Sequence, residues 1–336
     1  MRHVSESNPQ NSMQLTAQID QLGEKIIAAR NAVGEVIFGQ QAVIDQTFVT
    51  LLSGGHALLV GVPGLAKTRL VETLGGVIGL QDARVQFTPD LMPADILGSE
   101  VLEESEDGRR SFRFIHGPVF CQLLMADEIN RASPRTQSAL LQAMQEHQVT
   151  VAGQHYDLPQ PFHVLATQNP LEQEGTYPLP EAQLDRFLLQ IDVDYPDAEA
   201  ERRMLLATTG IQEVTPKQIM NDGDLRAAQH LVRQLPVGES VLDGILDLVR
   251  AARPEAAAAP DIRAHVAWGP GPRASQALAL AVRARALLEG RVSPSLDDVA
   301  ALAGPVLRHR MALNFTARAD GITVMDVIGR LIERLG

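Results

Sequence analysis

The 336-residue sequence predicts an α/β fold, in which a three-layer core with a mainly parallel five-stranded sheet is followed by an all-α domain. Two observations predict it. Five short apolar segments follow one another, and most of the intervals between them leave room for a helix. Beyond residue 196, apolar residues recur only at helical spacing. The expected strands are residues 57–60, 84–87, 123–127, 163–167 and 188–193.

The chain divides into three expected regions. Residues 1–12 are polar and predict a flexible tail, residues 13–196 form the α/β core, and residues 197–336 form the helical domain. At the boundary, Pro196 stops the last strand and Asp197 is placed to cap the next helix. The helical segments expected beyond it lie near residues 198–209, 223–234, 239–253, 273–289, 296–309 and 323–335.

Two intervals of the core carry an extra hairpin each. Strand-like segments flank Asp107-Gly108 in the first, near residues 99–115, and Ala152-Gly153 in the second, near 148–158. Each hairpin is either a solvent-exposed surface feature without a specific role or a moving element that contacts a partner. In the helical domain, the alanine-rich stretch 254–272 predicts a mobile connection.

Composition excludes several classes of protein. Lys and Arg number 29 against 41 Asp and Glu, a net charge of −12, which makes nucleic acid an unlikely partner because its binding rests on cationic side chains. The single cysteine, Cys121, excludes an internal disulfide and is expected to pack as a small hydrophobe. No apolar run approaches the ~20 residues that span a bilayer, and no secretory signal is evident, so we expect a cytoplasmic protein.

A glycine-bearing turn follows the first expected strand. It reads Gly61-Val62-Pro63-Gly64-Leu65-Ala66-Lys67-Thr68, the layout of a nucleoside triphosphate cradle, and Arg69 comes next. Backbone N–H groups of the turn face the phosphates, Lys67 meets the outer phosphate oxygens, and the Thr68 hydroxyl is placed to ligate Mg²⁺. Ala66 replaces the usual glycine, so its Cβ crowds the phosphates and narrows the allowed backbone angles. An ordinary strand–turn–helix is the alternative.

The third expected strand ends on two adjacent carboxylates, Asp127 and Glu128. Ligands gather outside the carboxyl ends of buried parallel strands. Asp127 would hold Mg²⁺, directly or through water. Glu128 would orient the attacking water and accept its proton, since neutral water has a pKa of about 15.7. Helix capping by the two acids is the alternative, but Ser133-Pro134 already supplies that helix start.

Taken together, these motifs resemble the AAA+ ATPases, and more narrowly the MoxR family. The resemblance covers most of the chain, and it implies the P-loop AAA+ core with a helical lid. The two hairpins resemble the helix-2 and pre-sensor insertions that this branch shares with magnesium chelatase motor subunits. The matching stretches are residues 61–68, 123–131, 166–170, 179–187 and 271–274.

The resemblance implies roles for five further residues. Asn169 would bridge the γ-phosphate and the attacking water, although a plain Asn-Pro turn is the alternative. Arg186 would reach the γ-phosphate of the neighbouring subunit, where a planar guanidinium suits the developing charge; a surface ion pair is the alternative. Arg273 would couple lid position to the nucleotide. Residues 36–39, which include Phe38 and Gly39, would contact the adenine by backbone and apolar packing, and no guanine-reading element is evident, so we expect ATP.

The expected function is Mg²⁺-dependent ATP hydrolysis at the subunit interfaces of a ring, a hexamer by family analogy, that remodels or matures client proteins. The resemblance also implies a partner with a von Willebrand A-type domain. An arginine supplied in trans is worth roughly 10³–10⁵ in rate, so an isolated monomer should hydrolyse ATP very slowly. A nucleic-acid motor or loader, and a nucleotide-gated scaffold with little turnover, remain the alternatives. The nine histidines show no metal-binding spacing and are expected to be scattered polar residues.

Overall fold

The computed structural model describes residues 9–104, 110–172, 175–209, 216–255 and 260–335. Its core is a parallel sheet of five strands in the order β2-β5-β8-β1-β9. The fold class and all five strands predicted from the sequence are confirmed. The strands are β1 (Ala57–Val60), β2 (Asp82–Gln86), β5 (Leu123–Asp127), β8 (His163–Gln168) and β9 (Leu189–Asp192).

Alternate residues of the central strands face two separate apolar clusters, which creates the three layers. Leu59 and Leu123 pack with the helices that precede and follow β1, whereas Leu58 and Leu124 pack with α5 on the other face. This alternation follows from the pleat of a strand, which directs successive side chains to opposite faces. The helices of the core are α1 (Pro9–Gly34), α2 (Gln41–Leu52), α3 (Lys67–Ile78), α4 (Pro93–Leu97), the 3₁₀ turn η1 (Ile129–Arg131), α5 (Pro134–Glu146) and α6 (Glu181–Leu184).

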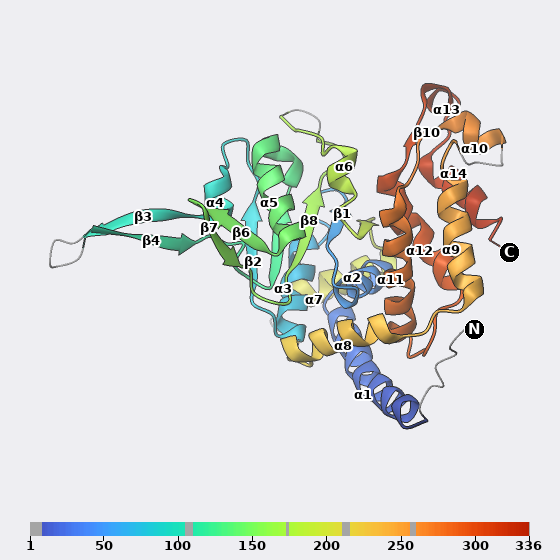
Figure 1. The fold of residues 1–336 in the computed structure, drawn as a ribbon, viewed down its shortest axis with the longest axis horizontal. Helices are drawn as coiled ribbons and strands as arrows, with labels where there is room; N and C mark the ends of the chain where they lie inside the picture. Colours follow the sequence, from blue (N-terminus) through green and yellow to red (C-terminus); the bar gives the residue numbers. More distant parts are fainter. Residues whose placement is uncertain (1–8, 105–109, 173–174, 210–215, 256–259, 336) are drawn as a thin grey trace, which may run out of the picture.

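Both predicted hairpins are present. The antiparallel pair β3 (Gly98–Glu104) and β4 (Arg110–His116) extends away from the core, and the Asp107-Gly108 turn between them lies outside the described residues (Figure 1). The shorter pair is β6 (Gln148–Val151) and β7 (Gln154–Asp157). The two hairpins pack together at their bases, where the Phe114 and Tyr156 rings stack with centroids 4.0 Å apart.

A run of helices begins after β9. The Asp197 side chain accepts the Ala200 N–H at 2.7 Å and so caps the first helix. The helices are α7 (Ala198–Thr208), α8 (Asp222–Gln234), α9 (Glu239–Ala251), α10 (Pro260–His265), α11 (Pro272–Leu288), α12 (Leu296–Leu307), the 3₁₀ turn η2 (Arg308–Arg310), α13 (Phe315–Ala319) and α14 (Val324–Ile332).

Three expectations need adjustment. The domain beyond residue 196 is not entirely helical, because β10 (Val266–Trp268) pairs with β11 (Ala312–Leu313) in an antiparallel ladder. The stretch 254–272, expected to be a mobile connection, contains α10 and β10. Helix α1 begins at Pro9, so four residues of the expected tail are helical. Strands of two or three residues are too short to show an alternating pattern, which explains the first difference.

The helical domain packs directly against the core. One continuous cluster of buried side chains joins Phe48 of α2 and Leu59 of β1 to Leu278 of α11 and Leu302 of α12. Figure 1 shows α11 beside α2 and α12 next to α11, with α9 and α14 further out. In the described part of the chain, no helix is both long and apolar enough to cross a bilayer.

Candidate active site

The glycine turn (residues 61–68) and the predicted acids lie along one edge of the sheet, which we call the carboxyl edge. Strand β1 ends at Val60 and leads into Gly61, β5 ends at Asp127, and β8 ends at Gln168. Because these strands are parallel, their carboxyl ends meet at the same edge. The Gly61 N–H donates to the Gln168 carbonyl at 3.2 Å, so the turn starts directly beside the residue that precedes Asn169.

The backbone of the glycine turn adopts a conformation of the kind that can present several N–H groups to an anion. Gly64 and Ala66 have φ angles of +84° and +56°, and the first-turn N–H groups of α3 have no acceptor within the helix. Ala66 therefore occupies a left-handed conformation that costs an alanine about 1–2 kcal/mol. A Cβ at Gly61 would lie 2.5 Å from the Val193 carbonyl oxygen, so only glycine fits there.

Lys67 lies between the turn and the two acids. Its Nζ donates to the carbonyl oxygens of Gly61 at 2.5 Å and Val62 at 3.0 Å. Burial lowers the pKa of the Lys67 ammonium, and the charges of Asp127 and Glu128 oppose that shift. Three residues that the sequence assigned to one phosphate site are thus close enough to interact electrostatically.

Asp127 is held on both of its oxygens. Oδ1 accepts the Thr167 hydroxyl at 2.6 Å, and Oδ2 accepts Nη2 of Arg84 at 2.6 Å. The same Thr167 oxygen accepts the backbone N–H of Glu128 at 2.9 Å, so one buried hydroxyl links the two acids. Neither Thr167 nor Arg84 was assigned a role from the sequence.

Glu128 has a constrained backbone and an anchored side chain. Its φ is +55°, in the left-handed region that costs a non-glycine residue about 1–3 kcal/mol and that is often found at functional sites. Its Oε2 accepts Nε2 of Gln86 at 2.8 Å and Nη1 of Arg131 at 2.9 Å. Strand β2 and the turn after β5 therefore aim this carboxylate.

A cavity of about 760 Å³ opens beside the glycine turn, a size that suits a nucleotide. Phe38 and Arg69, two of the residues predicted to contact the nucleotide, line this cavity. Gly39 does not line it; with φ +69°, it lets α7 approach, since a Cβ there would lie 2.5 Å from the Ala200 Cβ. The other lining residues include Val36, Ile37, Pro63, Gly64, Leu65 and Ala66.

Asn169 follows β8 at the carboxyl edge. Its Oδ1 accepts the Leu171 N–H at 3.1 Å, which is the plain turn considered as an alternative. That bond uses the amide oxygen and leaves the amide NH₂ group to donate. The turn and the predicted phosphate-sensing role are therefore compatible.

Arg186 lies at the opposite edge of the sheet, the amino edge. Strand β9 begins at Leu189, which pairs with Ala57 at the start of β1, and Arg186 precedes it by three residues. Three residue steps along β1 separate Ala57 from Val60, the residue before the glycine turn. At about 3.3 Å per residue, the two edges are at least about 10 Å apart.

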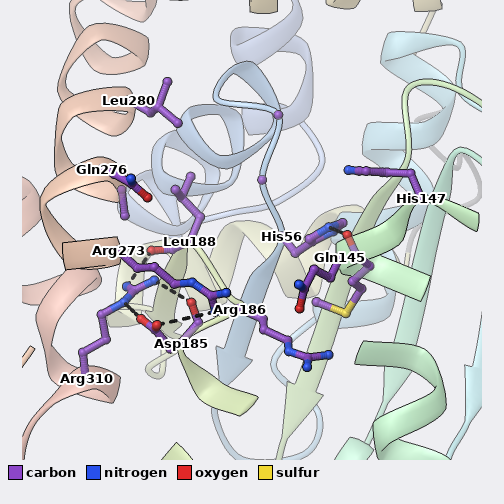
Figure 2. Close-up of a pocket in the computed structure, with 14 residues that line it drawn as sticks. His56, Gln145, His147, Asp185, Arg186, Leu188, Arg273, Gln276, Leu280 and Arg310 are labelled. Carbon is purple, nitrogen blue, oxygen red and sulfur yellow. Dashed lines mark hydrogen bonds and ion pairs between the residues drawn. The ribbon is translucent and has the colours of Figure 1, made fainter. Parts of the chain in front are cut away.

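Arg273, on the first turn of α11, lies with Arg186 and away from the glycine turn. Its Nη1 is 3.7 Å from Oδ2 of Asp185, and both arginines line a cavity of about 290 Å³. Figure 2 shows the two arginines on either side of Asp185, with the Arg186 side chain pointing away from the ion-paired group. Arg273 is absent from the lining of the larger cavity.

Comparisons with known proteins show the family of this chain. A model of the ATPase family associated with various cellular activities (AAA) matches residues 56–189, and an AAA lid domain model matches residues 258–331. Chaperone MoxR1 of Mycobacterium tuberculosis is 42% identical over 98% of this chain and 85% of its own length. The chain belongs to the MoxR family of AAA+ ATPases.

Two further relatives of this MoxR-family chain support the assignment. Protein MoxR of Paracoccus denitrificans is 33% identical over 85% of this chain and 88% of its own length. A solved structure from Cytophaga hutchinsonii, described as a candidate ATPase, superimposes with a TM-score of 0.89 at 35% identity and covers 97% of this chain and 98% of its own. The family inferred from the motifs is confirmed.

The oxygen atoms of this MoxR-type site fit Mg²⁺. Among the residues that the structure describes, the Thr68 hydroxyl has no hydrogen-bond partner and is free to act as a ligand. Asp127 already accepts two hydrogen bonds, but a carboxylate has about four lone-pair positions. Magnesium prefers one or two such oxygens together with phosphates and water. Thr68 and Asp127 are the residues that would hold the ion.

Three histidines gather near the start of β1. The His56 ring centroid is 6.3 Å from that of His147 and 6.5 Å from that of His163. His56 donates to the Met144 carbonyl at 3.2 Å and accepts the Val164 N–H at 2.9 Å, so it is neutral. The prediction that all nine histidines are scattered polar residues is wrong for His56, His163 and His309, which are buried. In the described part of the chain, no three potential ligands are placed to hold a metal.

Proposed function

We propose that this chain is a Mg²⁺-dependent ATP hydrolase whose active site is completed by a neighbouring copy. The main support for this proposal is that the two sets of residues lie at opposite edges of the sheet. Lys67, Asp127 and Glu128 lie together at the carboxyl edge. Arg186 and Arg273 line one cavity at the amino edge. A chain that separates its phosphate cradle from its interface arginines needs a second chain to bring them together. Repeating that contact head to tail gives a ring when the rotation closes.

Within one subunit, the residues at the carboxyl edge bind and orient the reactants. The backbone of the glycine turn and Lys67 hold the triphosphate. Thr68 and Asp127 would hold Mg²⁺, which would supply positive charge to neutralise the phosphates. Glu128 accepts a proton from water as the water oxygen bonds to the γ-phosphorus and the bond to ADP breaks. Because Gln86 and Arg131 hold the Glu128 carboxylate, its orientation is set before the water arrives.

Arg186 acts on the site of the next subunit. Its guanidinium spreads its charge over the phosphoryl oxygens as the bond to ADP breaks, and Arg273 approaches the same phosphate from α11. An arginine of this kind is worth roughly 10³–10⁵ in rate, or about 4–7 kcal/mol at about 1.36 kcal/mol per tenfold change. An isolated subunit therefore turns over slowly even with a complete cradle.

Rings assembled from two different variants test whether Arg186 acts on the neighbouring subunit's site. Arg186→Ala subunits keep an intact cradle, and Lys67→Ala subunits keep an intact arginine, so mixing two inactive proteins should restore part of the ATPase rate. Rings that contain both variants are verified by native mass spectrometry. Verified mixed rings with no recovery of phosphate release would refute a trans role for Arg186.

We further propose that the assembled ATPase, a hexamer by family analogy, remodels client proteins. The name of the mycobacterial relative, Chaperone MoxR1, supports this role. The β3–β4 hairpin, which extends away from the core, is the element best placed to reach a client. A partner with a von Willebrand A-type domain stays a prediction from the family.

Capture from lysate tests the client role. Glu128→Gln rings are expected to hold ATP and retain clients, while Lys67→Ala protein provides the nucleotide-free control. Proteins enriched on the first and absent from the second are the candidate clients. A nucleic-acid motor predicts a different result, namely salt-sensitive stimulation of ATP hydrolysis by DNA.

A further inference from the structure

Arg310 is a buried cation at the boundary between the helical domain and the core. Its side chain is 2% exposed, and it lies on η2, at the end of α12. Its guanidinium contacts residues 185–188. We call these residues the finger segment because they contain Arg186, the arginine proposed to act as a finger in the neighbouring subunit's site. Burial lowers the pKa of Arg310 and Asp185 opposes that shift, so the carboxylate favours the charged form.

All five N–H groups of Arg310 have an acceptor, which is the full capacity of a guanidinium. Nε donates to Oδ1 of Asp185 at 2.7 Å. Nη2 donates to the carbonyls of Asp185 at 3.2 Å and Phe187 at 2.6 Å. Nη1 donates to the carbonyls of Leu188 at 3.1 Å and Val306 at 2.6 Å. Four of these five bonds therefore hold the finger segment.

These bonds fix the backbone of Arg186 from both sides. The Asp185 carbonyl belongs to the peptide that precedes Arg186, and the Phe187 carbonyl lies one peptide beyond it. By contrast, the Arg186 guanidinium has no partner among the described residues and points away from the cluster (Figure 2). One arginine is thus fully paired, and the other is held at its base with a free head group.

Other contacts from the helical domain reinforce this attachment. His309 donates from Nε2 to the Phe187 carbonyl at 3.1 Å. Arg308 also pairs with the core, but its partner is Asp192 of β9, outside the finger segment. Arg273 of α11 is 3.7 Å from the other oxygen of Asp185. The finger segment, although part of the core chain, is therefore attached to the helical domain through η2 and α11.

We propose that Arg310 is a positioning residue that ties Arg186 to the position of the helical domain. The inference rests on the proposed role of Arg186 in the neighbouring site. A shift of the helical domain with nucleotide state moves the finger segment with it, so one subunit adjusts hydrolysis in the next. Lysine cannot replace this group, because a single ammonium cannot serve acceptors spread around a planar fork.

Steady-state kinetics separates positioning from binding. Arg310→Met should lower kcat about 100-fold, because displacement of a catalytic group by about 1 Å can cost that much. The KM for ATP should stay within about twofold, since Arg310 does not line the nucleotide cavity. Arg308→Met is the matched control: it removes an ion pair between helical domain and core without touching the finger segment, and should keep kcat within about threefold. Wild-type kcat for Arg310→Met would overturn the proposal.

Rescue in mixed rings decides in which subunit Arg310 acts. Arg310→Met mixed with Lys67→Ala should recover activity as Arg186→Ala mixed with Lys67→Ala does. The double variant Arg186→Ala/Arg310→Met should be no slower than Arg186→Ala alone, because the two residues act as one unit. If Arg310→Met does not assemble, the same mixing and double-variant experiments are made with Arg310→Lys, which keeps the charge but cannot make the five hydrogen bonds.

The outcomes distinguish this inference from the proposed function. Rescue of the Arg186→Ala mixture without rescue of the Arg310 mixture overturns the inference alone, because Arg310 would then serve its own subunit's site. Additive losses in the double variant would also overturn it. Rescue of neither mixture overturns the proposed trans site and the inference with it.

Discussion

The Thr167 hydroxyl donates a hydrogen bond of 2.6 Å to Oδ1 of Asp127. Because the same oxygen accepts the Glu128 N–H at 2.9 Å, the end of β8 fixes both acids at the end of β5. Thr167 is only 1% exposed, so no water replaces these bonds if the hydroxyl is removed. The geometry of the acidic pair therefore depends on the neighbouring strand.

Thr167→Val tests this dependence. Valine keeps the shape but leaves the Glu128 N–H without an acceptor, which should cost about 1–3 kcal/mol of unfolding free energy. We expect kcat to fall at least about tenfold, because the Glu128 carboxylate, which we propose activates water, loses its alignment. Thr167→Ser, which retains the hydroxyl, should keep most of the rate. Equal phosphate release by the valine variant and the wild type would contradict the account.

Ala66→Gly should improve the glycine turn. The left-handed backbone at φ +56° costs alanine about 1–2 kcal/mol, and the greater freedom of unfolded glycine offsets about 0.5–1 kcal/mol. A net gain of about 0.5–1 kcal/mol should appear in urea denaturation, together with tighter ATP binding by calorimetry. Ala152→Gly is the control, since Ala152 has φ +49° in the β6–β7 turn and should gain stability without changing ATP affinity. Weaker ATP binding by Ala66→Gly would count against a crowded cradle.

Stability should fall in mild acid because buried histidines are held neutral in the folded chain, and burial lowers the pKa of His309 as well as those of His56 and His163. Burial lowers the pKa of His56 to about 3 and that of His163 to about 4. Below pH 6.5 the unfolded chain binds protons that the folded chain cannot, so stability is retained above that pH and lost as pH falls toward 4. Each histidine contributes a slope of up to about 1.4 kcal/mol per pH unit.

His163→Asn isolates one of these contributions. Its amide can still donate to the Gly55 carbonyl, which His163 Nδ1 contacts at 2.8 Å. The variant should lose less unfolding free energy than the wild type between pH 6.5 and 4, by up to about 3 kcal/mol. The free energy of unfolding of both proteins is measured by chemical denaturation across this pH range. If it falls equally in the two proteins, protonation of His163 does not cause the loss of stability.

Arg84 should compete with Mg²⁺ for Asp127. Its Nη2 is 2.6 Å from Oδ2 of Asp127, and half of its side chain is exposed. Arg84→Gln removes a positive charge beside the proposed ion site, so the Mg²⁺ concentration for half-maximal ATPase should fall about two- to fivefold, the effect of up to ~1 kcal/mol. Arg226→Gln makes the same charge change on α8 and should leave the requirement unchanged. An increased requirement in Arg84→Gln would mean that the arginine supports the ion site.

Residues of the site that lie in local sequence motifs were predicted. Residues that reach the site from strands distant in the sequence were missed. Lys67 and Asp127 were predictable because each lies in a local motif after an apolar strand. Thr167 and Arg84 became visible only once β5 was placed between β2 and β8, and no local pattern specifies that order. Arg84 and Gln86 did give a signal, since they alternate along the expected strand and so share a face.

The buried ionisable residues were missed for a related reason. Arg310 follows an apolar helix and resembles an ordinary cationic helix end, yet the finger segment from the core encloses it. His163 opens an apolar strand, and its burial depends on Gln229 from the helical domain, whose Nε2 is 3.0 Å from His163 Nε2. Long-range packing of two domains produces both environments.

The most direct test is a structure of Glu128→Gln protein assembled with ATP and Mg²⁺. We expect a closed ring in which the Arg186 guanidinium of each subunit lies within about 3 Å of the γ-phosphate held by the next subunit's Lys67. A ring whose γ-phosphates contact only residues of their own chain, with Arg186 facing solvent, would contradict this expectation.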